Sequence, residues 1–180
     1  MPNPTLPDLP PGLAQRPRDL RRGLPIPVVN ERPDGCPDFA VLNGAMALKM
    51  AGLHRCSLCG RPLEGPAAFL GGPVSAKSGH YSDPPMHEDC AEAALTLCPH
   101  IARPHARRAS ERRISDDATV PVGFTLERPE EWVMVIASSY LMGVTLAEGG
   151  GVVPLFVVVG RQRQRRFVYA DGVLAEQSSN

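Results

Sequence analysis

The stretch that decides the fold is HRCSLCGRPL at residues 54–63, taken together with PPMHEDCAEAALTLCPHIA at residues 84–102. The first segment holds a Cys-x-x-Cys pair, and the second holds a His and a Cys at the same spacing. Tetrahedral Zn²⁺ takes four N or S ligands at about 2.0–2.3 Å, and two short rigid turns supply them with little loss of chain entropy. The sequence therefore predicts one structural zinc site, with Cys56, Cys59, His87 and Cys90 as ligands.

Each ligand pair lies on local structure that suits a thiolate. Gly60 follows the first pair and permits a positive φ, at which backbone amides turn toward the sulfurs. A separation of three residues on a helix puts His87 and Cys90 on one face, at the end whose dipole favours negative charge. We expect this helix to begin around residues 82–85, where Ser-Asp precedes Pro-Pro, and to end before Pro99.

Other residues compete for a place in this site. Cys98 follows Cys90 by two helical turns, about 12 Å along the axis, which argues against both binding one ion. Cys98 therefore fits a small core residue better, as does Cys36. His80 lies in the loop that leads into the helix and stays a second alternative. A redox dithiol is disfavoured because no βα unit precedes the Cys-x-x-Cys pair.

Composition sets limits on the class of protein. Among 180 residues, Lys+Arg and Asp+Glu are both 19, so net charge gives no argument for nucleic acid, an anionic membrane or an acidic substrate. Five cysteines, an odd number, fit metal ligation in a reducing compartment better than a disulfide framework. The chain shows no secretory signal and no run of about 18 apolar residues, so we expect a soluble, cytoplasmic protein.

The chain divides into three expected segments. Residues 1–35 carry nine prolines and are expected to form an extended or disordered arm, from which the apolar piece 24–29 can dock on the domain. Residues 36–118 form the zinc-binding α/β segment with a basic extension. Residues 119–180 are rich in β-forming residues and are expected to pack on it as a small antiparallel sheet.

Secondary structure follows from local patterns within these segments. Apolar residues spaced by three and four after Asp38, a plausible N-cap, predict a helix that reaches Leu53. A short strand is predicted around Ala67 to Leu70. Three β-rich runs separated by glycines are predicted strands, at residues 132–136, 151–159 and 166–169.

The order of turn, hairpin, loop and ligand-bearing helix over about residues 54–99 resembles a treble-clef zinc finger. The segments RRGLPIPVVN at 21–30 and RRFVYADG at 165–172, together with the two zinc segments, resemble uncharacterised actinobacterial or actinophage proteins. The resemblance implies an α+β fold with a treble-clef-like zinc site, the ligand role for the four residues above, and a host with a GC-rich genome. It implies no activity.

The favoured function is a non-enzymatic, zinc-stabilised module that binds a protein partner. An alternative is nucleic-acid binding through a basic stretch, Arg103, Arg107, Arg108, Arg112 and Arg113, which can lie along phosphates. A further alternative is a zinc-supported His-Me finger nuclease with His80 as general base, but no matching Asn is present. No Gly-rich phosphate loop, nucleophile elbow or dinucleotide fingerprint occurs, and enzymatic activity stays open.

Overall fold

The structure is a computed structural model that describes residues 8–32, 37, 39, 42–102, 129–147 and 151–177. The helices are α1 (Pro11–Ala14), the 3-10 turn η1 (Val28–Asn30), α2 (Gly44–Gly52), α3 (Pro73–Ser78), α4 (Glu88–Leu97) and α5 (Pro99–Ala102). The strands are β1 (Ala67–Gly71), β2 (His80–Tyr81), β3 (Glu131–Leu146), β4 (Val152–Ala170) and β5 (Val173–Gln177). No described helix has the length and apolar character that a bilayer span requires.

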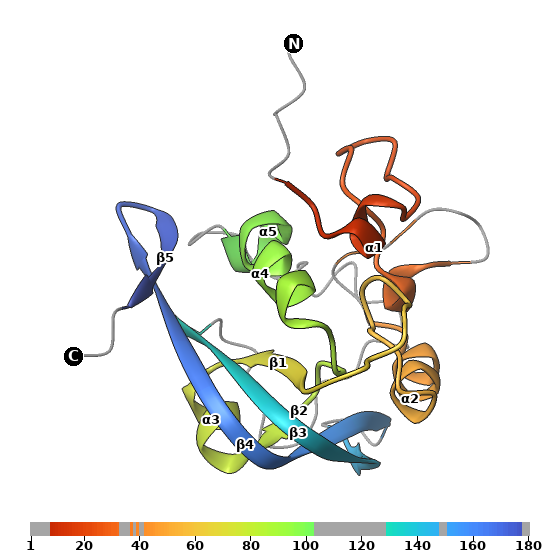
Figure 1. Cartoon of the computed structure of the whole chain (residues 1–180), viewed down its shortest axis with the longest axis vertical. Helices are drawn as coiled ribbons and strands as arrows, with labels where there is room; N and C mark the ends of the chain where they lie inside the picture. The colour runs from red at the N-terminus through yellow and green to blue at the C-terminus, as the bar shows by residue number, and fades with distance from the viewer. Residues whose placement is uncertain are drawn as a thin grey trace.

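The strands form one antiparallel sheet in the order β1-β3-β4-β2, and β5 pairs with β4. β3 and β4 make a long two-stranded ribbon that curls beneath α4 and α5 (Figure 1). Its register shifts between Ile136 and Ala137, next to Gly160 at φ +64°. A β-bulge bends a strand and increases its twist, so this irregularity gives the ribbon its curl.

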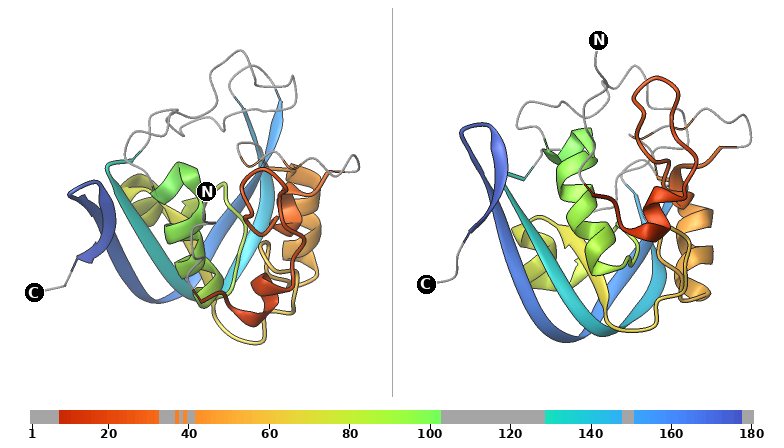
Figure 2. Two further views of the ribbon diagram at one scale, coloured as in Figure 1. Left: turned by 90° about the horizontal axis from the view of Figure 1, so that it is seen from above. Right: turned by 45° about the horizontal axis from the view of Figure 1, so that its top comes forward.

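Both faces of the first half of β3 are buried. Trp132, Met134 and Ile136 pack in a core cluster with α4 and the Cys-x-x-Cys turn, while Val133 and Val135 pack in a second cluster with α2 and β2. Figure 2 shows α4 in the hollow of the curled sheet and α2 against the far end of the ribbon. Burial on two faces explains why this strand is a continuous apolar run rather than an alternating one.

The prediction of an extended or disordered arm is wrong for residues 8–32, which fold onto the domain. Leu13 and Val29 are buried, and the backbone N–H groups of Val28 and Val29 donate to the carbonyls of Leu58 and Ser57. The prolines are accommodated because Pro11 occupies the first turn of α1, where an N–H has no helical partner. Docking of the apolar piece 24–29 is confirmed.

Two predicted helix starts are also wrong. α2 begins at Gly44, where the Asn43 side chain accepts from the N–H of Met46; Asp38 lies outside the described residues. α4 begins at Glu88, because its N-cap residue His87 is extended and Met86 exchanges backbone hydrogen bonds of 2.8 and 3.1 Å with Ala68. The predicted strand at 67–70 is confirmed as β1.

The β-rich runs predicted for the C-terminal segment form longer strands than expected. The runs 151–159 and 166–169 belong to a single strand, β4, which includes the arginine-rich residues between them. β1 from the predicted zinc segment pairs with β3 along residues 133–137. The two predicted segments therefore share one sheet.

Candidate metal centre

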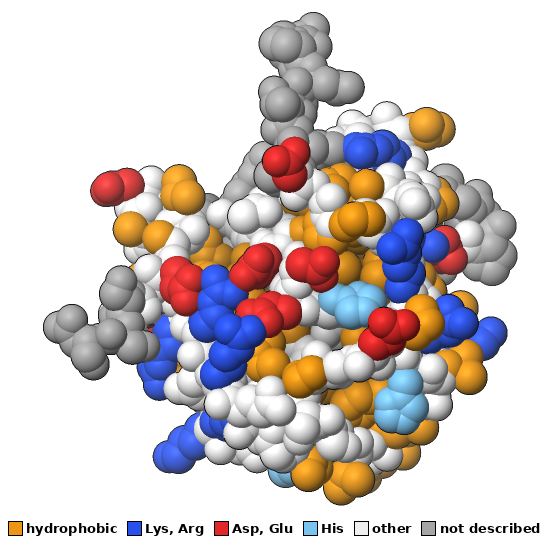
Figure 3. All heavy atoms as spheres, viewed as in Figure 1, with side chains coloured by type: hydrophobic (Ala, Val, Ile, Leu, Met, Phe, Trp, Pro, Cys, Tyr) orange, Lys and Arg blue, Asp and Glu red, His pale blue; other side chains and the backbone are white. Residues whose placement is uncertain are grey.

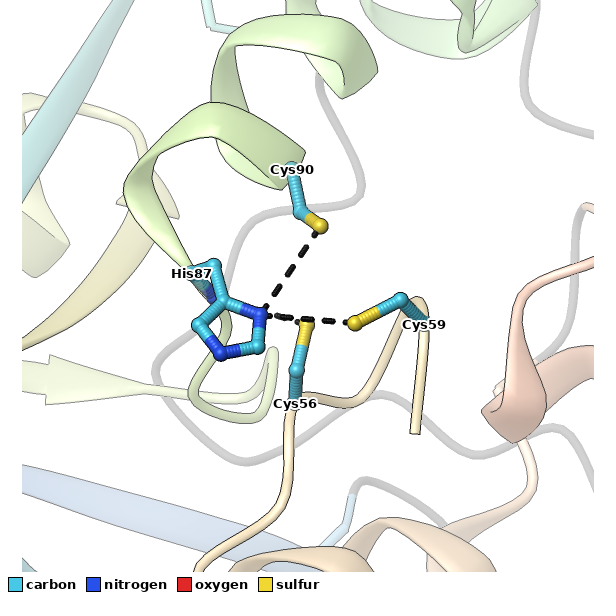
Figure 4. Close-up of side chains that lie close together, drawn as sticks. All are labelled: Cys56, Cys59, His87 and Cys90. Carbon is cyan, nitrogen blue, oxygen red and sulfur yellow. Dashed lines mark hydrogen bonds between the residues drawn. The ribbon is translucent and has the colours of Figure 1, made fainter. Parts of the chain in front are cut away.

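Four potential metal ligands converge from two elements. Figure 4 shows Cys56 and Cys59 on the turn that precedes β1, facing His87 and Cys90 at the start of α4. The three Sγ atoms and one imidazole nitrogen all lie within 4.8 Å of one another. All four residues that the sequence predicted as ligands are in this cluster.

The Cys-x-x-Cys turn is built by backbone hydrogen bonds. Gly60 has φ +77°, and its N–H donates to the carbonyl of Cys56 at 2.8 Å. The N–H groups of Cys59 and His87 hydrogen bond to Cys56 Sγ, and that of Arg61 hydrogen bonds to Cys59 Sγ. Amides directed at sulfur stabilise thiolates before any metal arrives.

His87 is oriented on both sides of its ring. Its Nδ1 lies 3.3 Å from Cys59 Sγ and 4.0 Å from Cys90 Sγ. A tetrahedral ion with ordinary Zn–S and Zn–N bonds separates S and N by about 3.6 Å, and the two distances bracket this value. On the far side, Nε2 lies 2.9 Å from the carbonyl oxygen of Pro62, which fixes Nδ1 as the ligating atom when Nε2 donates.

The three thiols perturb one another's protonation. Hydrogen bonds from Cys56 and Cys90 lower the pKa of Cys59 to about 2. The pKa of Cys56 is raised, chiefly by its hydrogen bond to Cys59, and the pKa of Cys90 is raised by its hydrogen bonds to Cys56 and Cys59. Because the three thiols hydrogen bond to one another, the protonation of each depends on the other two. A metal ion binds the deprotonated thiolates, so its binding would release these protons.

Apolar packing closes off the three thiols, while His87 is partly buried. Cys56 and Cys90 are 0% and 1% exposed, and they belong to the same core cluster as Leu13 and Met86. α1 lies directly on the site, because a Cβ added to Gly12 would come within 3.1 Å of Cys59 Sγ. The contacts of Gly12 and of the Pro62 carbonyl could not be predicted from the sequence, since neither residue type signals such a contact.

The other candidate ligands lie elsewhere. His80 is on β2, exposed and paired with Val157, and it is not in the cluster. Cys98 is the C-cap residue of α4, partly buried against the core cluster that contains Cys90. Cys36 lies outside the described residues.

Basic side chains that bear on nucleic-acid binding lie in two parts of the chain. Arg103, Arg107, Arg108, Arg112 and Arg113 lie outside the described residues. Three of the four arginines of β4 form ion pairs with acids. Arg163 pairs with Glu88, and Arg166 pairs with Glu131 at 2.9 Å. Arg165 pairs with Glu88, Glu92 and Glu176, and Figure 3 shows acidic and basic side chains intermixed on the face viewed there.

Fold and site together define a mixed helix and sheet protein with a curled antiparallel sheet and a Cys₃His cluster compatible with a metal ion. Comparison of the chain with protein-family models, with curated proteins and with solved structures found no match. The functional proposal therefore rests on the geometry of the site and of the surfaces around it.

Proposed function

We propose that the protein is a non-enzymatic binding module whose central segment is held together by one structural Zn²⁺ on Cys56, Cys59, His87 and Cys90. The observation that carries this proposal is the convergence of three Sγ atoms and one Nδ1 within 4.8 Å, in a buried apolar setting. Three thiolates and one imidazole are the ligand set of a structural zinc site, and soft sulfur ligands disfavour Mg²⁺ and Ca²⁺. The order of turn, β1 and α4 supports a treble-clef-like description.

A structural role suits the site better than a catalytic one. A catalytic zinc keeps one coordination position for water, whereas four protein ligands fill a tetrahedron. Glu88 and Asp89 are the acids adjacent in sequence to His87 and Cys90. Asp89 Oδ1 accepts from the N–H of Cys90 at 2.7 Å, and the Glu88 carboxylate is paired with Arg163 and Arg165. Both oxygens of the Glu88 carboxylate are therefore engaged in ion pairs with β4.

A protein partner is favoured over nucleic acid by the charges that the structure describes. Phosphate binding needs cationic side chains that are free to replace counterions. Arg163, Arg165 and Arg166 are committed to acidic partners, and the net charge of the chain is zero. Nucleic-acid binding through Arg103 to Arg113 remains the alternative proposal.

Cobalt substitution tests the metal proposal and separates a closed site from an open one. We expect Co²⁺ to give the intense visible absorption of a tetrahedral thiolate complex, unchanged by added azide because no coordination position is open. The Cys98→Ser variant serves as the matched control and keeps the spectrum, whereas Cys90→Ser loses it. A spectrum that shifts with azide would indicate an open position and would contradict the structural role.

Fluorescence anisotropy with labelled duplex DNA and single-stranded RNA tests the choice of partner. We expect no salt-sensitive complex in the micromolar range. A complex that contacts several phosphates would weaken by about 10³–10⁵ between 50 and 200 mM salt, so measurements at both salt concentrations would reveal it. A complex that disappears when Arg107, Arg108, Arg112 and Arg113 are changed to Ala would reverse the assignment to a protein partner.

A further inference from the structure

The outer edge of β3 changes character where β1 ends. β1 pairs with β3 only along residues 133–137, and among the described residues nothing pairs with the outer edge of β3 over 138–146. This stretch reads Ser-Ser-Tyr-Leu-Met-Gly-Val-Thr-Leu and contains no charge and no proline. Leu141 and Leu146 are 63% and 64% exposed. It is an open strand edge with apolar side chains.

β4, the other strand of the ribbon, carries charged residues or proline where its far edge is unpaired. The far edge of β4 is paired at Phe156 and Val157 by β2 and at residues 166–170 by β5. Between them it carries Arg161, Arg163 and Arg165, and before them it carries Pro154. Charges and proline are the devices that keep strand edges from pairing with other chains. The same protein uses them on β4 and omits them on β3 at residues 138–146.

The pairing of β3 with β4 determines which backbone N–H and C=O groups of β3 point outward, away from β4. The N–H of Ala147 donates to the carbonyl of Gly151 at 2.7 Å, so residue 147 directs its backbone groups at β4. Antiparallel ladders alternate, and register is continuous from 146 back to 139, so odd residues face β4 and even residues face outward. The outward groups therefore belong to residues 140, 142, 144 and 146.

This edge is complementary to a copy of itself. A two-fold axis at Met142 sets 142 opposite 142 and 140 opposite 144, with about six backbone hydrogen bonds between the copies. The axis stands perpendicular to the sheet, so apolar side chains meet on each face and no like charges are brought together. Leu53 at the end of α2, 56% exposed, follows Gly52, which lies against Met142, and extends the apolar surface.

We propose that residues 138–146 of β3 pair antiparallel with the same edge of a second copy, forming a two-fold dimer in which one sheet runs through both subunits. The proposal stands on strand geometry and apolar exposure and does not depend on the identity of the metal. It goes beyond the binding module proposed above, because it assigns an interaction surface and its occupant.

Two variants test the pairing by different means. Val144→Pro removes an outward N–H and leaves the β3–β4 ladder intact, since residue 144 does not donate to β4 and proline is tolerated at strand edges. Leu141→Lys places like charges near the axis in both copies. Val173→Lys is the matched control, because Val173 is 67% exposed on β5, away from the proposed interface.

Light scattering during size exclusion, with each protein loaded at about 100 µM so that a micromolar dimer is populated, gives the readout. We expect wild type and Val173→Lys at twice 19.3 kDa, and both edge variants at 19.3 kDa with unchanged metal content and circular dichroism. A monomeric wild type, or edge variants that remain dimeric, would overturn the proposal. Amides of residues 140, 142 and 144 that stay protected from exchange in a monomer would show instead that the chain covers its own edge.

Discussion

Gly12 of α1 lies against Cys59 of the candidate metal centre, and a Cβ at residue 12 would meet both the Cβ and the Sγ of Cys59 at 3.1 Å. The N-terminal segment is therefore the cover of the site rather than a separate tail. Arg61 reinforces the contact through a 2.8 Å hydrogen bond to Gln15.

Gly12→Ala is expected to loosen this cover. The added methyl group forces α1 away from the Cys-x-x-Cys turn, at a cost of about 1–3 kcal/mol as in other overpacked sites. We expect a lower urea midpoint and faster removal of bound metal by a chelator. Gly65→Ala is the matched control, because nothing lies within 4 Å of a Cβ at that position. Equal behaviour of the two variants would mean that α1 does not cover the site.

Loss of a ligand is expected to unfold the central segment. Cys56→Ser and Cys90→Ser each remove a buried thiol from the proposed zinc site, whose metal would contribute about 10 kcal/mol or more to folding. Cys98→Ser and His80→Ala leave the cluster intact and should fold normally. Circular dichroism with and without a chelator measures the difference, and release of metal by His80→Ala alone would show that the ligand set is wrong.

Two tyrosines, the buried Tyr81 and the half-buried Tyr140, are expected to respond differently to loss of their hydroxyl groups. Tyr81 Oη is buried with no hydrogen-bond partner among the described residues, whereas Tyr140 Oη donates to the carbonyl of Ala51 at 2.8 Å. Tyr140→Phe is expected to cost about 1 kcal/mol, and Tyr81→Phe to cost nothing or to stabilise the fold. Urea unfolding at pH 7 compares them, and a clear loss of stability in Tyr81→Phe would mean that its hydroxyl is satisfied in solution.

The stability of the folded protein is also expected to fall at alkaline pH because of Tyr81. Burial raises the pKa of Tyr81 from 10.0 to about 12, against a smaller opposing effect of Arg161. The folded state holds the Tyr81 proton more tightly than the unfolded state does. The contribution of this proton to the free energy of unfolding is therefore complete below pH 10 and is lost as the pH rises from 10 to 12. The loss amounts to about 2–3 kcal/mol. We expect wild type to lose stability over this range more steeply than Tyr81→Phe, and parallel curves would contradict the assignment.

The ion pairs of Arg165 are expected to hold α4 on the sheet in a salt-dependent way. Its side chain contacts Glu88, Glu92 and Glu176 and is 24% exposed, while Arg163 is 56% exposed and pairs with Glu88 alone. Arg165→Met should cost about 1 kcal/mol at low salt and less in 1 M salt, where the Debye length is about 3 Å, and Arg163→Met should cost less than this. Equal effects at both salt concentrations would assign the role of Arg165 to its alkyl packing.

The ligand cluster could be predicted from sequence because two Cys/His pairs at short spacing encode their own local geometry. The start of α4 could not, since Pro84 and Pro85 are compatible with a helical first turn and with an extended chain. Met86 decides between them by pairing with Ala68, a contact between residues far apart in sequence. Local patterns do not contain that information.

The arginine-rich part of β4 and the N-terminal segment escaped prediction for related reasons. Residues 161–166 resemble a break between strands until Glu88 and Glu92 of α4 are placed opposite them. The proline-rich residues 8–32 have too few apolar side chains to fold alone, yet Leu13 and Val29 fill gaps that the rest of the chain leaves. In both cases a partner supplied by the tertiary fold overrides the local composition.

Metal content per chain, measured together with thiol accessibility before and after chelation, tests the proposed structural zinc site most directly. The account predicts one zinc per chain, with Cys56, Cys59 and Cys90 protected from a thiol reagent until the metal is removed. Purified protein without zinc, in which these three cysteines react freely, would contradict it.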